Sequence, residues 1–257
     1  MKKFIKIFCV FLFTILTVTS CQKSQTSRPQ LIVGLQAGYP PFESINEKGE
    51  VIGFDVDIAQ ELAESLGKDL KIVEMGFDGL ILGLKNKKID LIVSGVSITH
   101  DRLQKIAMVP YFGEDQKELT LLFWQTSSNI KSFDELNGQV VAVQSGNFQA
   151  DIINSYKNVQ VKELENVTDL IMDIQYGKSF AALVEPKTAQ EMISHHPDLI
   201  AVNIPLKEDE QVMGFGIGIR PDDIQMIDFV TTEVKKLQNQ QKIKALADKW
   251  FKGVSQP

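Results

Sequence analysis

One stretch of the sequence places small residues and a single arginine directly after an apolar run. The run at 89–93 (IDLIV) is typical of a buried strand, and the letters SGVSITHDR follow it. The small residues Ser94, Gly95 and Ser97 allow backbone N–H and C=O groups to approach a ligand closely. Arg102 adds a planar fork of donors that suits a carboxylate held by two parallel hydrogen bonds. These residue types favour a site for the anionic end of a small ligand.

The same stretch also has a purely structural interpretation. Ser97 or Thr99 has the hydroxyl that caps a short helix, and the N-terminus of such a helix favours an anion. Arg102 would then be an exposed residue paired with Asp101 or Glu114, and exposed pairs contribute little to stability. Both interpretations fit the residues of the stretch.

Three other groups of residues stand directly after predicted strands, where ligands bind in open α/β sheets. Tyr39 lies in a loop stiffened by two prolines, where it either faces a ligand or fills the core together with Phe42. Phe77 begins a helix and either faces a cleft or acts as a hydrophobic staple. Glu185 follows an apolar run and either binds a ligand or caps the helix that starts at Pro186.

The elements that position these residues alternate between strand-length apolar runs and amphipathic helices. Apolar residues recur every four positions from Phe54 to Leu66, as on one face of a helix, and Gly67 ends the pattern. This alternation is typical of mostly parallel sheets with helices on both faces. Strands are predicted at 31–35, 70–73, 89–93, 140–143, 159–161 and 181–184, and helices at 54–66, 79–84, 148–156 and 167–176.

The pattern divides into two α/β lobes. Two extended apolar runs without a helical period, Glu118–Trp124 and Gly214–Ile219, are predicted to be strands that cross between the lobes. The tail, Asp222–Phe251, is predicted to form two helices. Arg102 then lies on one lobe, Glu185 lies on the other, and aromatic rings lie between them. This arrangement predicts a receptor for a zwitterion.

Composition agrees with a soluble protein of two domains. The 257 residues are 44% hydrophobic and 23% charged, as in ordinary globular proteins. The net charge is −6 and the basic residues are scattered, which argues against nucleic acid as a partner. The sequence has no glycine-rich phosphate loop, serine elbow or paired-histidine metal motif, so no catalytic residue, cofactor or metal site is predicted.

The N-terminus has the pattern of a secretory signal. Three lysines in the first six residues precede an apolar run at 7–18 that is too short for a stable membrane span. Small and polar residues before Cys21 resemble a bacterial lipobox. Residues 1–20 are therefore predicted to be a lipoprotein signal peptide, Cys21 the lipidated N-terminus, and residues 21–29 a polar tether. A plain secretory signal cleaved nearby is the alternative.

The sequence also contains a set of short motifs that is specific in combination. These motifs are GYPPF at 38–42, GFDVD at 53–57, FDGL at 77–80, SGVSITHDR at 94–102, VQSG at 143–146 and KWF at 249–251. Together they resemble the amino-acid-binding proteins of bacterial ABC transporters, the polar amino-acid solute-binding family, from Leu31 to Phe251. The stretch YPPFESI is similar to the arginine-binding members in particular, among them the chlamydial lipoproteins.

The resemblance implies a type II, two-lobed periplasmic-binding-protein-like α/β fold, with two mixed sheets flanked by helices and joined by two crossing strands. Residues 30–118 and 213–257 would form the first lobe, and residues 119–212 the second. The lobes would close on L-arginine or another polar or basic amino acid. The monomeric receptor, held to the membrane outside the cytoplasm by its lipid anchor, would deliver the amino acid to an ABC transporter permease. No covalent chemistry is implied.

The same resemblance implies how the two charged groups of an amino acid are bound. Arg102 would hold the α-carboxylate, together with backbone N–H groups near Ser97. The N–H groups of Asn147 and Phe148, at the start of the second lobe's first helix, would assist. Glu185 stands where the family usually has aspartate and would bind the α-ammonium.

Further contacts are implied around the ammonium group and the side chain of the ligand. The carbonyl oxygen of Ser94 or Gly95 and the hydroxyl of Ser97 would also contact the ammonium. Tyr39 and Phe77 would enclose the ligand side chain between two aromatic faces, where a guanidinium gains cation–π attraction.

The sequence departs from the family pattern at two places. Gln36 stands where relatives that bind cationic side chains carry an acid, so a charged partner for a guanidinium comes from Glu43, from another acid, or from none. At 146–148 the letters GNF replace the usual threonines, which removes a hydroxyl and adds Phe148 as a third possible aromatic wall. These departures leave glutamine or another neutral polar amino acid open as the ligand.

Two functions from other classes are also open. A few proteins with this fold are cyclohexadienyl dehydratases, lyases that use an arginine and an acid in the cleft, and Glu185 could serve as that acid. A surface protein that binds a host or regulatory partner is compatible with a lipid anchor. Such a protein would carry a large exposed apolar patch away from the cleft.

Overall fold

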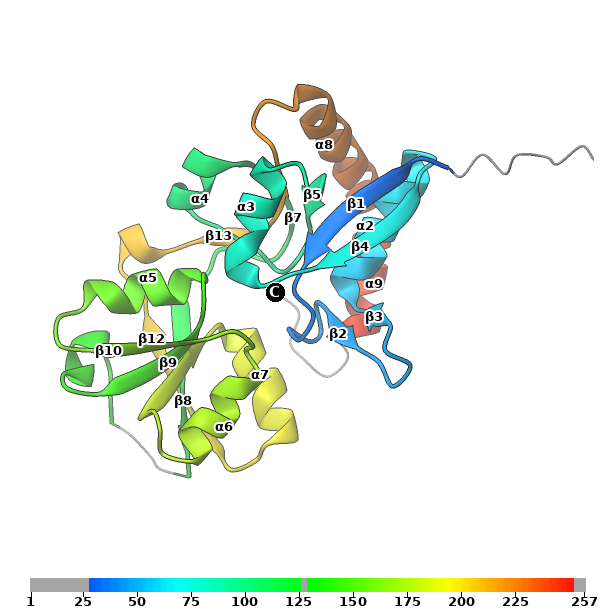
Figure 1. The fold of residues 1–257 in the computed structure, drawn as a ribbon. Coiled ribbons are helices and arrows are strands. Elements are labelled where there is room, and N and C mark those ends of the chain that lie inside the picture. Colours follow the sequence, from blue (N-terminus) through cyan, green and yellow to red (C-terminus); the bar gives the residue numbers. More distant parts are fainter. Residues whose placement is uncertain (1–27, 126–128, 252–257) are drawn as a thin grey trace, which may run out of the picture.

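The computed structural model describes residues 28–125 and 129–251, which form two lobes, each built on one β-sheet (Figure 1). The predicted signal peptide and Cys21 lie outside the described residues. In the part of the chain that is described, no helix is both long and apolar enough to cross a membrane.

The first lobe holds a mixed sheet. Its strands are β1 (Gln30–Leu35), β4 (Asp69–Glu74), β5 (Leu91–Ile92), β6 (Ser97–Ile98), β7 (Ala107–Phe112) and β13 (Met213–Ile219). The order is β4-β1-β5-β13-β6, with β7 also paired to β13. β1 is parallel to β4 and β5, whereas β13 is antiparallel to its neighbours.

Helices cover both faces of this sheet. They are α2 (Phe54–Ser65), η1 (Phe77–Gly79), α3 (Leu80–Lys85), α4 (His100–Lys105), α8 (Ile224–Asn239) and α9 (Lys242–Trp250), and a small hairpin of β2 (Ser44–Ile45) and β3 (Val51–Ile52) precedes α2. Val33 of β1 packs in one core with Ile58 and Leu62 of α2. Ile32 packs against a separate core that contains Leu80 of α3. Alternate β1 side chains thus serve opposite faces, as the period of two in a strand requires.

The second lobe holds another mixed sheet. Its elements are β8 (Glu118–Trp124), η2 (Phe133–Leu136), β9 (Val140–Gln144), α5 (Phe148–Ser155), β10 (Gln160–Leu164), α6 (Asp169–Gln175), β11 (Ala181–Val184), α7 (Pro186–His195), β12 (Leu199–Pro205) and η3 (Glu208–Glu210). The order is β10-β9-β11-β8-β12, with β8 antiparallel to β11 and β12. The predicted fold, two mixed sheets flanked by helices, is confirmed.

The chain crosses between the lobes twice, but not within the strands predicted to cross. β8 lies wholly in the second sheet and β13 wholly in the first. The crossings are the short segments before these strands, at 113–117 and 206–212. The two segments are joined by a bridge in which the Gln116 N–H donates to the Val212 carbonyl at 2.8 Å. The extended apolar character of β8 and β13 reflects burial inside a sheet rather than a connecting role.

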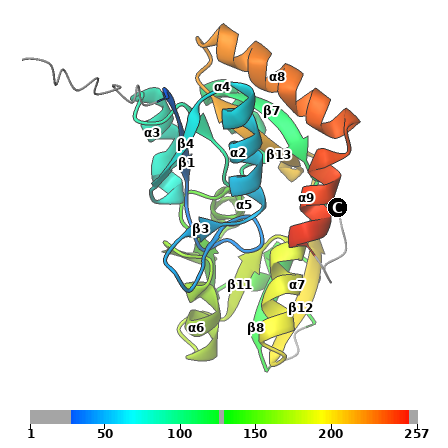
Figure 2. The same ribbon diagram turned by 90° about the vertical axis from the view of Figure 1, so that its right-hand side faces the viewer.

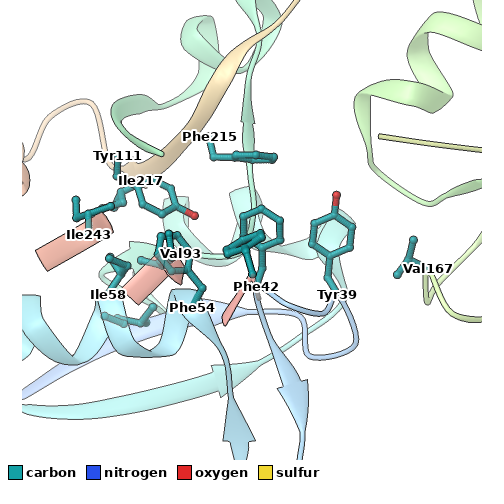
Figure 3. Packing of buried hydrophobic residues seen from close by; sticks show 14 of the residues in the cluster. Tyr39, Phe42, Phe54, Ile58, Val93, Tyr111, Val167, Phe215, Ile217 and Ile243 are labelled. Atoms are coloured by element: carbon teal, nitrogen blue, oxygen red, sulfur yellow. The ribbon is translucent and has the colours of Figure 1, made fainter. Parts of the chain in front are cut away.

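A cluster of aromatic rings lies where the first lobe faces the second (Figure 3). The Phe42 ring is 4.8 Å from the ring of Phe215 and 5.2 Å from that of Phe251, measured between centroids. Tyr39 stacks on Phe42 at 5.3 Å and lies on the side of the cluster towards Val167 of the second lobe. Helix α9 packs beside α2 (Figure 2), and Phe251, which follows its last residue, joins the cluster through its contact with Phe42.

Candidate functional site

The predicted site residues come together where the two lobes meet. Loops that follow β1 and β5 of the first lobe face the residues that end β9 and begin α5 of the second. They enclose a narrow space between the lobes. This space is lined by Gln36, Tyr39, Glu43, Phe77, Ser94, Gly95, Gln144 and Asn147. Of these, only Gln144 was not among the predicted site residues.

Glu185 reaches across from the second lobe to the first. Its side chain is 2% exposed, and its Oε1 accepts a hydrogen bond from the Ser97 hydroxyl at 2.7 Å. Its Oε2 accepts one from the Tyr39 hydroxyl, whose oxygen in turn accepts from the Thr188 hydroxyl at 2.8 Å. Burial raises the pKa of Glu185, and the bonds from Tyr39 and Ser97 and the charge of Arg102 oppose that rise.

The structure excludes the capping interpretation of Glu185. The residue precedes α7 and takes the N-cap position, but its side chain makes no capping bond to the helix. Pro186 removes one of the N–H groups that a cap would satisfy. The carboxylate is therefore free to serve the cleft rather than its own helix.

Arg102 is buried in the first lobe beside the cleft. It is 5% exposed, its Nη1 donates to the Ser97 carbonyl at 2.8 Å, and its Nη2 donates to the Gly146 carbonyl of the second lobe at 3.3 Å. Its Cζ lies 5.3 Å from the centre of the Phe77 ring. Burial lowers the pKa of Arg102, and the charge of Glu185 is the main opposing influence.

The local structure around Arg102 excludes the exposed interpretation. Thr99, not Ser97, caps α4, because its hydroxyl accepts from the Arg102 N–H at 3.1 Å. Asp101 pairs with Lys105 one turn along the helix instead of with Arg102. Ser97 is left to join the two charged side chains, since its carbonyl holds Arg102 and its hydroxyl holds Glu185.

Amide groups line the part of the site that lies near the second lobe. The Gln36 Oε1 accepts from the Gln144 Nε2 at 2.6 Å, and the Gln36 Nε2 donates to the Glu165 carbonyl at 2.8 Å. These bonds again join the two lobes. Gln144 is the last residue of β9, within the motif VQSG, so its place at a strand end was the signal that could have revealed it.

Asn147 and Phe148 differ from the prediction. The Asn147 N–H donates to the Gln144 carbonyl at 3.3 Å, and the Phe148 N–H donates to Asn147's own Oδ1 at 2.9 Å. Both predicted donors are thus bonded within the chain, because Asn147 caps α5 with its own side chain. The Phe148 ring is 4% exposed and packs in the core of the second lobe, so it is not a third aromatic wall.

Glu43 lines the space and also bonds to the loop around it. It is 1% exposed, and its Oε1 accepts from the Ser94 hydroxyl at 2.8 Å. The Ser94 oxygen accepts the Gln36 N–H at 3.1 Å, so Glu43 braces the loop that lines the site. The acids near Phe77 are Asp78 and, from the second lobe, Glu163 and Glu165, all of them exposed.

This geometry can be compared with that of known proteins. The profile of the family described as bacterial extracellular solute-binding proteins, family 3, matches residues 31–253. The chain belongs to this family. A relative from Chlamydia trachomatis serovar D, the probable ABC transporter arginine-binding protein ArtJ, is 35% identical over 96% of this chain and 94% of its own length.

Solved structures of arginine-binding proteins agree with the fold. The arginine-bound form of truncated ArgBP from T. maritima superposes with a TM-score of 0.73 at 36% identity, over 81% of this chain and 96% of that one. An ancestral arginine-binding protein bound to glutamine gives a TM-score of 0.78 at 25% identity, over 87% of this chain and 98% of that one. This chain is therefore a solute-binding protein, and its interpretation as a non-enzyme is confirmed by these relatives.

Proposed function

We propose that this family 3 solute-binding protein captures L-arginine between its lobes and delivers it to the permease of an ABC transporter. The observation that carries the proposal is the pair of buried, opposite charges, Arg102 and Glu185, that Ser97 joins across the lobes. A free amino acid offers the complementary pair, an α-carboxylate and an α-ammonium, on one carbon. Each charge of the ligand then meets an opposite charge in a site shielded from water, where such pairing is strong.

The binding step follows from where these groups lie. The Arg102 guanidinium offers N–H donors beside Ser97 and takes the carboxylate, while the Glu185 carboxylate takes the ammonium. Because Arg102 and Glu185 belong to different lobes, a ligand that bonds both favours their approach. The cross-lobe bonds of Gln36 and Tyr39 then add to the closed arrangement. The ligand thus supplies the differential contacts that a shift between open and closed lobes requires.

Arginine is supported by the surroundings of the ligand side chain. The rings of Tyr39 and Phe77 line the same space, and a planar cation placed between aromatic faces is attracted to both. Asp78, Glu163 and Glu165 line an adjoining hollow that shares Phe77 with this space, and they give it a negative field. Several relatives are named as arginine-binding proteins, which agrees with this choice.

A neutral amide ligand such as L-glutamine is the second candidate. The bonded amides of Gln36 and Gln144 are the observation that favours it, because each offers both a donor and an acceptor to a ligand amide. One structural relative has glutamine bound. The two candidate ligands differ only in the side chain, since Arg102 and Glu185 would bind the α-carboxylate and α-ammonium of either one.

We also propose that the receptor acts outside the cytoplasm and is held to the membrane through lipid on Cys21. The lipobox-like residues before Cys21 support this anchor. Mass spectrometry of the N-terminal peptide would show an acylated cysteine, whereas an unmodified N-terminus at a neighbouring residue would indicate a plain secretory signal.

The binding proposal is tested by isothermal titration of the mature protein with each of the twenty amino acids. We expect heat from L-arginine and, at higher concentration, from L-glutamine. Binding of glutamine at least as tight as that of arginine would replace the first candidate by the second. The absence of binding to every amino acid would contradict both.

A further inference from the structure

We propose that Glu43 is a neutral carboxylic acid that shares its proton with Asp55, and that this pair positions Ser94 and Gly95 at the ligand site. The proposal rests on the proposed function, because Ser94 and Gly95 line the space assigned to the amino acid. Neither carboxyl bonds directly to Arg102 or Glu185, the two residues proposed to bind the charged groups of the ligand. Both affect the ligand site through the loop that contains Ser94 and Gly95.

The two carboxyl groups hold neighbouring residues of one loop. The Ser94 hydroxyl donates to the Glu43 Oε1 at 2.8 Å, and the Gly95 N–H donates to the Asp55 Oδ2 at 2.5 Å. The Tyr111 hydroxyl donates to the other oxygen, Oδ1, of Asp55 at 2.5 Å. All five groups are buried, with Asp55 fully so.

The backbone brings the two acids side by side. The Asp55 N–H donates to the carbonyl of Phe42, the residue before Glu43, at 3.0 Å. A Cβ on Gly53 would lie 2.7 Å from the Glu43 Cα, so only glycine allows the start of α2 to approach so closely. The remaining oxygen of Glu43, Oε2, is buried and receives no hydrogen bond from a described residue. An oxygen in that position is satisfied if it carries a proton and donates it.

Electrostatics requires the same proton. No basic side chain of the described residues acts on either carboxyl; the ionisable groups that face the pair are the phenols of Tyr39, from the loop after β1, and Tyr111, from β7. Two adjacent buried carboxylates without a cation cannot both be ionised, so one proton is retained. Burial and the neighbouring Asp55 raise the pKa of Glu43 well above its ordinary value, and burial raises that of Asp55 to about 6. Asp55 accepts a hydrogen bond at each of its oxygens, whereas Glu43 accepts one and has an unpaired Oε2, so Glu43 is the residue that keeps the proton.

The consequence for the site is a fixed loop. Gly95 has a φ of +51°, and a Cβ there would lie 2.9 Å from the Tyr39 ring, so the loop is already confined on its ligand side. Glu43 and Asp55 restrain this loop further, because Glu43 bonds to the side chain of Ser94 and Asp55 bonds to the backbone of Gly95. The acidic residues of the motifs GYPPFE and GFDVD thus serve the site by holding the loop at Ser94 and Gly95. Glu43 and Asp55 are positioning residues.

Infrared difference spectroscopy and calorimetry together test the proposal. Glu43→Gln keeps a donor and an acceptor in the same places, and the exposed Glu47→Gln, in the hairpin of β2 and β3 that follows Glu43, is the matched control. At neutral pH, the spectrum of the wild type minus that of Glu43→Gln should show the C=O stretch of a protonated carboxylic acid, whereas the Glu47→Gln difference should not. Glu43→Gln should change the affinities for L-arginine and L-glutamine by the same factor, because no charge at the site is altered.

Asp55→Asn provides the positioning arm of the test. An amide has one acceptor oxygen, so the bond from Gly95 or the bond from Tyr111 is lost unless the Tyr111 hydroxyl turns to accept from the amide nitrogen. The proton of Glu43 also loses its charged partner, so the restraint on the loop is weakened. We expect affinity for L-arginine to fall by about tenfold or more. Tyr111→Phe removes only one donor to Asp55 and serves as the milder variant if Asp55→Asn does not fold.

Three results would overturn the proposal or part of it. A missing carboxylic acid band would show that Glu43 is ionised. A loss of affinity in Glu43→Gln that is confined to L-arginine would show that Glu43 faces the ligand guanidinium. Undiminished affinity in a folded Asp55→Asn, or in Tyr111→Phe if that variant replaces it, would remove the positioning role. If the wild type binds no amino acid, the proposed function fails and the positioning role with it, whereas the band still decides the shared proton.

Discussion

Gly146→Ala tests whether the bound lobes approach each other as closely as they do here. Gly146 has a φ of +71°, in the left-handed region, and it faces the first lobe across the cleft. A Cβ at this position would lie 2.6 Å from the Cα and 2.7 Å from the Cβ of Asp78. Because these atoms belong to the backbone and to the base of a side chain, neither can turn aside.

The size of the effect follows from two separate costs. An alanine in the left-handed region costs about 1–2 kcal/mol, which lowers the free energy of unfolding. The clash must be relieved by moving the lobes apart by about 1 Å, since carbon atoms attract at about 3.5–4.0 Å. That movement weakens the bond from Arg102 to the Gly146 carbonyl and those that join Gln36 to the second lobe. We expect the affinity for L-arginine to fall by about 10–100-fold, or about 1.4–2.8 kcal/mol.

Gly138→Ala is the matched control. Gly138 lies in the same lobe at a similar φ of +79°, but a Cβ there meets nothing within 4 Å. Both variants should lower the melting temperature by similar amounts, whereas only Gly146→Ala should weaken binding in isothermal titration. If the two variants bound L-arginine equally tightly, the close approach of Gly146 to Asp78 would not belong to the bound form, and the reasoning would be refuted.

Three further predictions concern the charged groups. Arg102→Lys should weaken L-arginine and L-glutamine binding alike, by about 10–100-fold in titration, because an ammonium cannot make two parallel bonds to a carboxylate. Unequal losses would show that Arg102 contacts the ligand side chain. Glu185→Gln should weaken L-arginine binding by a similar factor of about 10–100-fold while leaving 5-guanidinovalerate, which lacks the α-ammonium, little affected; an equal loss for both would contradict the ammonium role. The third concerns pH. The pKa of Glu43 is higher in the folded protein than the value of 4.5 for a free glutamate. Its contribution to the free energy of unfolding is therefore complete below pH 4.5. Above pH 4.5 the contribution declines by about 1.4 kcal/mol per pH unit, until Glu43 loses its proton in the folded protein. Denaturant unfolding of Glu43→Gln should therefore show a gain over the wild type that grows from pH 4.5 to 7, and a constant difference would contradict the raised pKa.

The fold was predictable where a single periodic pattern dominates. Helix α2 followed from apolar residues at every fourth position, which face one side of the helix; Phe54, Ile58 and Leu62 are buried there. The strand predicted at 89–93 is shorter, Leu91–Ile92, although backbone bonds of Asp90 and Val93 to β1 extend its pairing, and Gly95 beyond it has a positive φ. The crossing segments were missed because β8 and β13 are apolar for a different reason, burial within a sheet.

The site was predictable only in part, and sequence distance explains the division. Arg102, Ser97 and Glu185 were identified because each follows a strand, where ligands bind in α/β folds. The bond of Tyr39 to Glu185 joins residues 146 positions apart, and that of Gln36 to Gln144 joins residues 108 apart. No local pattern shows that such pairs meet. A ring of uncertain role, such as Phe148, was equally consistent with a cleft and with a core until its neighbours were known.

The most direct test of the account is a titration of L-arginine into the wild type and into Arg102→Ala. The clamp of Arg102 and Glu185 predicts that the wild type binds L-arginine, and that a folded Arg102→Ala gives no measurable heat with L-arginine or any other amino acid. Binding of similar affinity by the two proteins would contradict the central claim, because the carboxylate of the ligand would then be held by some other group.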